Sequence, residues 1–238
     1  MKFLSIPFCG IDSILHMSKT LKIILIIVAI LIVDQVSKFI VKTNMTLYEQ
    51  IPVFGNWFII HFVENRGMAF GMNLPGDYGK ILLSLFRLAA IIAIGFYIRH
   101  LVKENAHRGL LITLSMVMAG AIGNMIDSAF YGMIFNESNR YLPAVLFPEG
   151  GGYDTFLHGN VVDMFYFPII NGSYPEWFPW IGGQTFTFFR PVFNVADASI
   201  SVAVIILLIK QKSFFKHLDE KDDEVLSAAE QNKNSDGN

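Results

Sequence analysis

Three pairs of polar residues interrupt stretches of sequence that are otherwise strongly apolar. The pairs are Asp34 with Lys38, Asn124 with Asp127, and Asn194 with Asp197. The members of each pair are three or four positions apart, so on a helix they share one face. A charged side chain inside a membrane helix costs roughly 2.5 to 3.5 kcal/mol on insertion and is therefore a functional candidate by default. Three polar faces at one depth are expected to meet in one pocket.

Asp197 is the strongest candidate for chemistry in this set. Its carboxylate lies near the start of an apolar run and no basic residue is close to it in the sequence, so it needs a partner from elsewhere in the fold. Asp163 precedes an aromatic segment and is a candidate to return to the same pocket. For Lys38 and Arg87 a simpler interpretation is favoured, in which Lys38 forms a local ion pair with Asp34 and both long side chains reach toward the membrane surface.

Composition places the chain among membrane proteins. Of its 238 residues, 53% are hydrophobic and 16% are charged, and the mean hydropathy is +0.47, which is atypical of a soluble globule. The net charge of -2 and the lack of a basic patch give no indication of nucleic-acid binding. With Cys9 as its single cysteine, the chain has neither an intramolecular disulfide nor a cysteine-rich metal site.

Four apolar stretches are long enough to cross a membrane. They lie at 21–41, 81–98, 109–126 and 192–209. Basic residues cluster before the first stretch, between the second and third, and after the fourth. By the positive-inside rule both termini are cytoplasmic, and the connections 42–80 and 127–191 lie on the outer side. All three polar pairs then lie at the outer ends of their helices, which predicts a pocket that opens outward.

The prediction is an α-helical membrane protein with four transmembrane helices and further structure in the two outer connections. Aromatic and branched residues at 57–63 predict a strand and a small periplasmic sheet. Aromatic residues between 166 and 180 predict a helix or loop on the membrane surface. The expected organisation is an N-terminal cytoplasmic extension at 1–20, a membrane domain at 21–210 and a disordered cytoplasmic tail at 211–238.

The start of the chain allows two interpretations. Translation from Met1 gives the full extension, whereas translation from Met17 leaves Lys19 and Lys22 as the basic flank of the first helix. A cleaved signal peptide is the less favoured alternative, because a long apolar run follows.

Five short motifs occur in a fixed order along the apolar part of the chain. They are VDQVSK at 33–38, NRGMAFG at 65–71, GNMID at 123–127, VVD at 161–163 and FNVAD at 193–197. In this order they resemble the boxes of the lipoprotein signal peptidases, or signal peptidase II, over roughly 21–209. The four-helix topology of that family, with both termini inside, agrees with the charge distribution.

The resemblance implies an aspartic endopeptidase of the bacterial cytoplasmic (inner) membrane with its active site at the periplasmic face. Such an enzyme removes the signal peptides of diacylglyceryl-modified prolipoproteins by cleaving before the lipidated cysteine, without a metal or other cofactor. Asp163 and Asp197 match the catalytic pair. The residues that match the surrounding shell, which orients the pair and the substrate, are Asp34, Lys38, Asn65, Asn124, Asp127 and Asn194. The expected partners are lipid-modified prolipoproteins and membrane lipid, with no nucleic acid, and a monomer is expected.

Two features depart from the family pattern. The family usually has arginine directly after the aspartate of the Gly-Asn-x-x-Asp box, where this chain has Ser128. Arg140 and Arg190 are candidates to supply that charge. The connection between the third and fourth motifs is also longer than usual, and the segment 131–158 is interpreted as an inserted lid or docking segment.

Two other classes of protein fit parts of the pattern. A small transporter or channel would use Asp34, Asp127 and Asp197 as a cation or proton relay, and a membrane scaffold would perform no chemistry. Polar residues at only one end of the helices argue against a path through the membrane. The peptidase hypothesis is therefore preferred.

Overall fold

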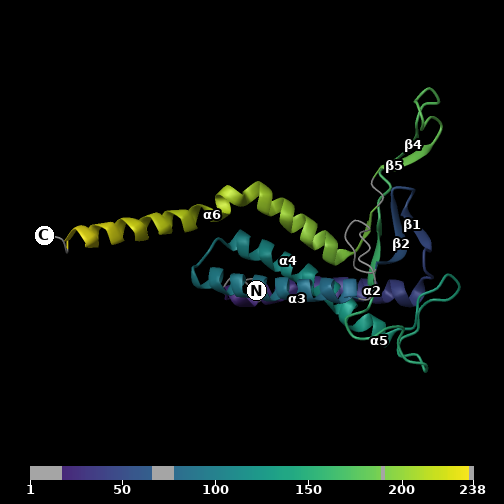
Figure 1. Cartoon of the computed structure of the whole chain (residues 1–238), viewed down its shortest axis with the longest axis horizontal. Coiled ribbons are helices and arrows are strands. Elements are labelled where there is room, and N and C mark those ends of the chain that lie inside the picture. The colour runs from purple at the N-terminus through teal and green to yellow at the C-terminus, as the bar shows by residue number, and fades with distance from the viewer. Residues whose placement is uncertain (1–17, 66–77, 189–190, 236–238) are drawn as a thin grey trace, which may run out of the picture.

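The structure, a computed structural model, describes residues 18–65, 78–188 and 191–235. It consists of long helices that carry small sheets at one end (Figure 1). Most of the predicted N-terminal extension, with both candidate start residues, lies outside the described residues, as does Arg190.

Three of the described helices are long and apolar enough to cross a membrane. They are α2 (Lys19–Asn44), α3 (Tyr78–Lys103) and α4 (Arg108–Ile126). The first three predicted helices are therefore confirmed, although each of α2 and α3 extends a few residues further at both ends. Helix α6 is not among these three, and the fourth span stays a prediction.

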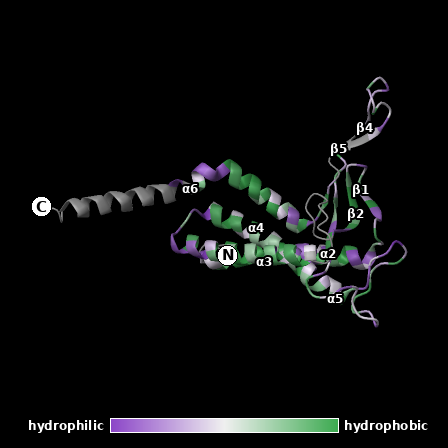
Figure 2. Cartoon of the chain, in the orientation of Figure 1, coloured by the Kyte–Doolittle hydropathy of each residue, from purple (hydrophilic) through white to green (hydrophobic). Residues whose placement is uncertain are grey.

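Apolar side chains cover much of the outer surface of the helices. Ile32, Phe86 and Phe96 leave 58%, 70% and 71% of their areas exposed, and Figure 2 shows hydrophobic ribbon along the long helices and the first half of α6. So much exposed apolar surface is unfavourable in water. It is suited to contact with lipid.

Helix α6 covers Val195–Ser235 and differs from the predicted fourth helix at both ends. The predicted start at Val192 is wrong, because Val192–Phe193 forms the short strand β6, which pairs with strand β3. At the other end α6 continues through the tail, whose Glu, Lys, Ala and Leu residues favour a helix. Figure 1 shows this part projecting away from the other helices. A projecting helix is marginal in water, so disorder of the tail stays a prediction.

A four-stranded antiparallel sheet lies at one end of the helices (Figure 1). Its strands, in spatial order, are β1 (Gln50–Phe54), β2 (Phe58–Asn65), β3 (Val161–Tyr166) and β6. Strand β2 contains nearly all of the predicted strand, which confirms the small sheet. The register of β2 and β3 places Asn65 opposite Val161 and Val63 opposite Asp163. Two predicted site residues therefore lie on neighbouring strands.

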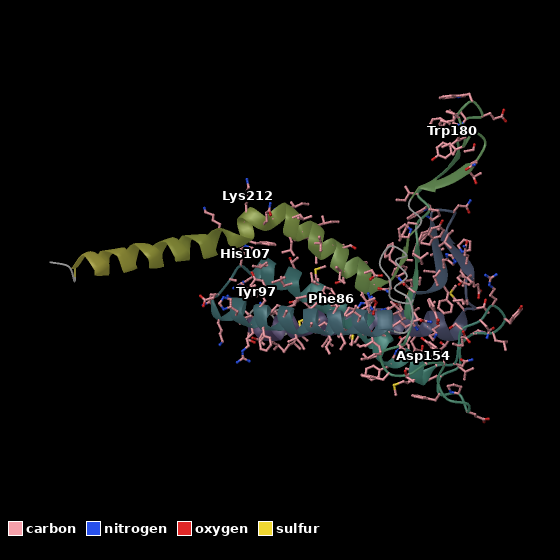
Figure 3. All side chains as sticks on the ribbon, in the orientation of Figure 1. Phe86, Tyr97, His107, Asp154, Trp180 and Lys212 are labelled. Carbon is pink, nitrogen blue, oxygen red and sulfur yellow. The ribbon has the colours of Figure 1, made fainter. Side chains whose placement is uncertain are left out.

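The aromatic segment, predicted as a helix or loop, forms a separate two-stranded hairpin whose connecting loop contains Trp177 and Trp180. Its strands are β4 (Ile170–Ser173) and β5 (Thr185–Phe188). In Figures 1 and 3 the hairpin extends across the direction of the helices and carries Trp180 near its tip. Trp177 and Trp180 are 79% and 95% exposed. Such rings are typical of a membrane–water interface.

The chain after α4 forms part of a core and is not simply a lid. A π-helix, η2 (Asp127–Tyr131), and the short helix α5 (Gly132–Ile134) follow α4 directly. The buried residues of this core come from the end of α2, from the sheet and from the segment interpreted as an insertion: Val41, Met45, Phe62, Tyr131, Phe135, Ala144, Val162 and Met164. The insertion is thus anchored beneath the sheet.

Candidate active site

Asp197 is fixed by its position in the first turn of α6. The Asp197 backbone N–H donates to Asn194 Oδ1 at 2.9 Å, and the Asn194 backbone N–H donates to Asp197 Oδ2 at 3.4 Å. This reciprocal arrangement is a capping box at the start of the helix. A carboxylate is also favourable at this end of the helix dipole. The spacing in FNVAD therefore orients the Asp197 carboxylate as well as starting the helix.

Asp163 reaches the same place from strand β3. Strand β3 pairs with β6, which directly precedes α6. Asn194 Nδ2 donates to Asp163 Oδ1 at 2.7 Å, and Asn65 on the neighbouring strand β2 also hydrogen-bonds to Asp163. Only 4% of Asp163 is exposed. Asn194 therefore contacts both aspartates and holds them side by side.

The electrostatic environment of Asp163 favours a proton on the pair. Burial and then repulsion from Asp197 raise the pKa of Asp163 to about 7. The charge of Lys38 and the hydrogen bonds from Asn194 and Asn65 lower the pKa, but they are weaker. Because the two carboxyls interact, the proton belongs to the pair. The arrangement can hold one ionised and one neutral carboxyl near neutral pH.

Asn124 joins this pair to a buried lysine. Its Nδ2 donates to Asp197 Oδ1 at 2.7 Å, while its Oδ1 accepts from Lys38 Nζ at 2.9 Å and from Asn194 Nδ2 at 3.1 Å. Two donors on one side and a carboxylate on the other fix the orientation of the Asn124 amide. The GNMID motif on α4 thus contributes directly to the position of Asp197.

Lys38 is fully buried and forms two ion pairs, with Asp34 at 2.8 Å and with Asp127 at 2.9 Å. The predicted local pair is present, but Lys38 does not reach toward the membrane surface. Asp34 Oδ1 accepts from the backbone N–H of Ala196 at 2.8 Å. Asp127 Oδ2 accepts from the backbone N–H of Val162 at 3.2 Å. The two aspartates therefore hold the residues that precede Asp197 and Asp163.

Two glycines of α4 allow the helices to approach at this point. A Cβ atom at Gly120 would lie 2.4 Å from the carbonyl oxygen of Ala196, and one at Gly123 would lie 2.7 Å from Asp34 Oδ2. Glycine, which has no Cβ, is the residue that permits such close contact. Any larger residue at either position would push α6 or α2 away from the site.

The structure brings all the predicted site residues into one hydrogen-bonded network, and it adds residues that the sequence reasoning missed. Gln35 donates to Asp127 Oδ1 at 2.9 Å and to Asp34 Oδ2 at 3.1 Å. Its place between Asp34 and Lys38 in the first motif was the available signal. In the described part of the chain, no group of three or more His, Cys, Asp or Glu residues is arranged to hold a metal ion.

Arg87 is the second missed residue. Its Nη1 donates to Ser128 Oγ at 3.1 Å, so it turns into the protein and the prediction that it reaches the membrane surface is wrong. Arg140 does not replace it, because the Arg140 guanidinium lies 4.8 Å from the centre of the Tyr48 ring. Arg190 lies outside the described residues.

Long apolar helices with a carboxylate pair at one end, formed by the buried Asp163 and the partly exposed Asp197, define an integral membrane protein with an enzyme-like site. Comparisons with known proteins agree. A solved structure described as a bacterial membrane enzyme, determined in meso at 1.9 Å resolution, is 26% identical with a TM-score of 0.52 and covers 82% of this chain and 97% of its own. A second such structure at 2.3 Å resolution shares the fold, with a TM-score of 0.51 and 24% identity, covering 81% of this chain and 89% of its own.

The sequence comparisons are more specific. Residues 26–213 match the family model of signal peptidase (SPase) II. The lipoprotein signal peptidase of Porphyromonas gingivalis is 52% identical over 185 residues, which cover 77% of this chain and 80% of that protein. That of Amoebophilus asiaticus is 37% identical over 185 residues, covering 76% and 74%. The chain belongs to the signal peptidase II family.

Proposed function

We propose that the protein is an aspartic endopeptidase that cleaves diacylglyceryl-modified prolipoproteins just before the lipidated cysteine. Removal of prolipoprotein signal peptides follows from the family, which also favours a peptidase over a transporter or scaffold. The observation that supports the aspartic mechanism is the pair formed by Asp163 and Asp197 around Asn194, in which the pKa of Asp163 is raised to about 7.

In the proposed mechanism the two carboxyls divide the work of amide hydrolysis. The ionised carboxylate takes a proton from a water molecule as the water oxygen adds to the scissile carbonyl carbon. The neutral carboxyl donates its proton to the carbonyl oxygen as negative charge develops there. When the tetrahedral intermediate collapses, the C–N bond breaks and the proton taken from water passes to the departing amine. As the new carboxyl group forms, one hydroxyl of the intermediate returns its proton to the other carboxylate of the pair. The pair is left with one proton, ready for a second cycle.

The surrounding residues would maintain this geometry without reacting. Asn194 and Asn124 hold the two carboxylates, and Lys38 with Asp34 and Asp127 holds the backbone beneath them. Fixed donors and charges of this kind do not need to reorganise during the reaction, and that accounts for much of the efficiency of enzyme active sites.

We propose that the site faces the periplasm from the inner membrane of a bacterium, in a monomer with four spans and both termini cytoplasmic. This placement is supported by the basic residues that flank the apolar stretches. It suits a substrate whose acyl chains stay in the bilayer while its scissile bond meets water. Reporter fusions test the placement: a fusion after Lys42 or near Gly151 is expected to report the outer compartment and one after Lys103 the cytoplasm. An outer signal at Lys103 would overturn the topology.

The catalytic proposal is tested with Asp163→Asn and Asp197→Asn in purified protein and a lipidated prolipoprotein. Asparagine keeps the size and much of the hydrogen bonding, but it does not exchange the proton. Each change is expected to lower kcat by on the order of 10³-fold or more, and the double variant by little more, because the residues act as a unit. The matched control is Asp154→Asn, which removes a carboxylate paired with Lys80 outside this network. Near wild-type cleavage by folded Asp197→Asn protein would refute the mechanism.

A further inference from the structure

Helix α3 carries a polar stripe on a face that turns away from its exposed apolar side. Lys80, Ser84 and Arg87 are spaced four and three residues apart, so they share one helical face. Leu82 and Phe86, on other faces, are 61% and 70% exposed. An arginine in an apolar helix is costly unless it reaches water or a charged partner. The groups that these polar side chains contact therefore indicate what the stripe does.

The first two residues of the stripe hold the segment that follows α5. Lys80 Nζ donates to Asp154 Oδ2 at 3.2 Å, and Ser84 Oγ donates to the carbonyl oxygen of Leu157 at 3.2 Å. These contacts dock α3 against the insertion.

Arg87 is linked through Ser128 to the backbone of Asn124, a residue of the carboxylate network. It is half-buried, and its Nη1 donates to Ser128 Oγ, whose hydroxyl in turn donates to the carbonyl oxygen of Asn124 at 3.1 Å. Asn124 is the residue that donates to Asp197. The Arg87 charge also interacts with the carboxylates of Asp197, Asp127 and Asp163, most strongly with Asp197.

The charge balance at the site leaves a place for a second cation. Four carboxyls lie in the network, those of Asp34 and Asp127 around Lys38 and those of the Asp163–Asp197 pair. Lys38 is committed to its two ion pairs. Opposite charge nearby favours the ionised form of a carboxyl, so a second cation would set the pH range in which the pair holds a single proton.

We propose that Arg87 is the positioning residue that supplies this cation. Its side chain extends from α3, and its guanidinium hydrogen-bonds to the side chain of Ser128. An arginine carried on α3 and an arginine carried at position 128 would then be alternative ways to place a guanidinium beside the same two aspartates. This inference rests on the proposed aspartic mechanism. It accounts for Ser128, because a small hydroxyl leaves room for the Arg87 guanidinium and hydrogen-bonds to it.

The test is the pH profile of cleavage by Arg87→Gln protein. Loss of the cation disfavours the ionised carboxylates, so both limbs of the kcat profile are expected to move to higher pH by about one unit, with KM little changed. Arg87→Lys keeps the charge and is expected to stay near the wild-type profile. Arg99→Gln, at the other end of α3, is the matched control and is expected to behave as wild type. A merely structural role would lower the amount of folded enzyme without moving the limbs.

An exchange of positions sharpens the test. Ser128→Arg alone would bring two guanidinium groups together and is expected to lower kcat. Arg87→Gln combined with Ser128→Arg is expected to be more active than either single variant, with its limbs returned toward the wild-type pH. Unmoved limbs in folded Arg87→Gln protein, or a double variant no more active than Arg87→Gln, would overturn the proposal. Cleavage by Asp197→Asn in the same assay reports on the aspartic mechanism separately, so the two failures are distinguishable.

Discussion

Two fully buried lysines lie one turn apart on α2, and their surroundings differ in charge balance. Lys38 is shared by two aspartates beneath a second pair of carboxyls. Lys42 pairs with one carboxylate, Glu64, and donates to Ser138 Oγ at 2.8 Å. Glu64 also accepts from Ser138 and Asn160. The first cluster has an excess of carboxyls, whereas the second is neutral.

Glu64 and Asp163, which both lie on strands, have pKa values that are shifted in opposite directions. Burial raises the pKa of Glu64, but the charge of Lys42 and the hydrogen bonds outweigh it, so the pKa of Glu64 is lowered overall. Burial together with Asp197 raises the pKa of Asp163. A matched ion pair serves to anchor the insertion to α2 and β2. An unmatched carboxyl pair keeps a proton at neutral pH, which general acid–base chemistry requires.

The largest effect that this comparison predicts comes from Lys38→Met. Removal of the lysine leaves Asp34 and Asp127 buried without their common cation, and breaking a buried ion pair in this way costs about 3–5 kcal/mol. We expect a strong loss of stability, measured by thermal unfolding in detergent, together with loss of cleavage. If Lys38→Met protein unfolds at the wild-type temperature, the charge of Lys38 does not stabilise the cluster.

Lys42→Met is expected to cost less, about 1.5–3 kcal/mol, because Glu64 is partly exposed and can take up a proton. The double variant Lys42→Met with Glu64→Leu removes both charges and is expected to recover part of that loss. In either variant that folds, the pH profile of cleavage should stay in place. A shifted pH profile would mean that the Lys38 and Lys42 clusters interact electrostatically.

The smallest expected effect on stability has the opposite sign. Asp163→Asn is expected to stabilise the fold, although it abolishes cleavage. A raised pKa means that the folded protein binds this proton more tightly than the unfolded chain does. Stability is therefore lost as the pH rises from the ordinary aspartate range to about 7 and stays lower above it. Asparagine removes this cost, so at alkaline pH the variant should gain about 0.5–2 kcal/mol. Equal stability of the two proteins at alkaline pH would contradict the raised pKa.

The site was predictable from sequence where its contacts are local or carried by motifs. Asn194 and Asp197 share a capping box, so their spacing alone predicts that they cooperate. The inward orientation of Arg87 and Lys42 was not predicted, because the side to which a basic residue turns depends on what packs against its helix. Strand β6 was assigned to a helix because two apolar residues before an apolar helix carry no distinguishing pattern.

The central claim is that Asp163 and Asp197 share one proton and act together. It is tested most directly by the pH dependence of kcat/KM for a lipidated prolipoprotein, which reports the ionisation of the free enzyme. We expect a bell-shaped profile whose alkaline limb falls as the pH rises through about 7, where the pair loses its last proton. A value of kcat/KM that stays level from roughly pH 6 to 9 would contradict the shared proton.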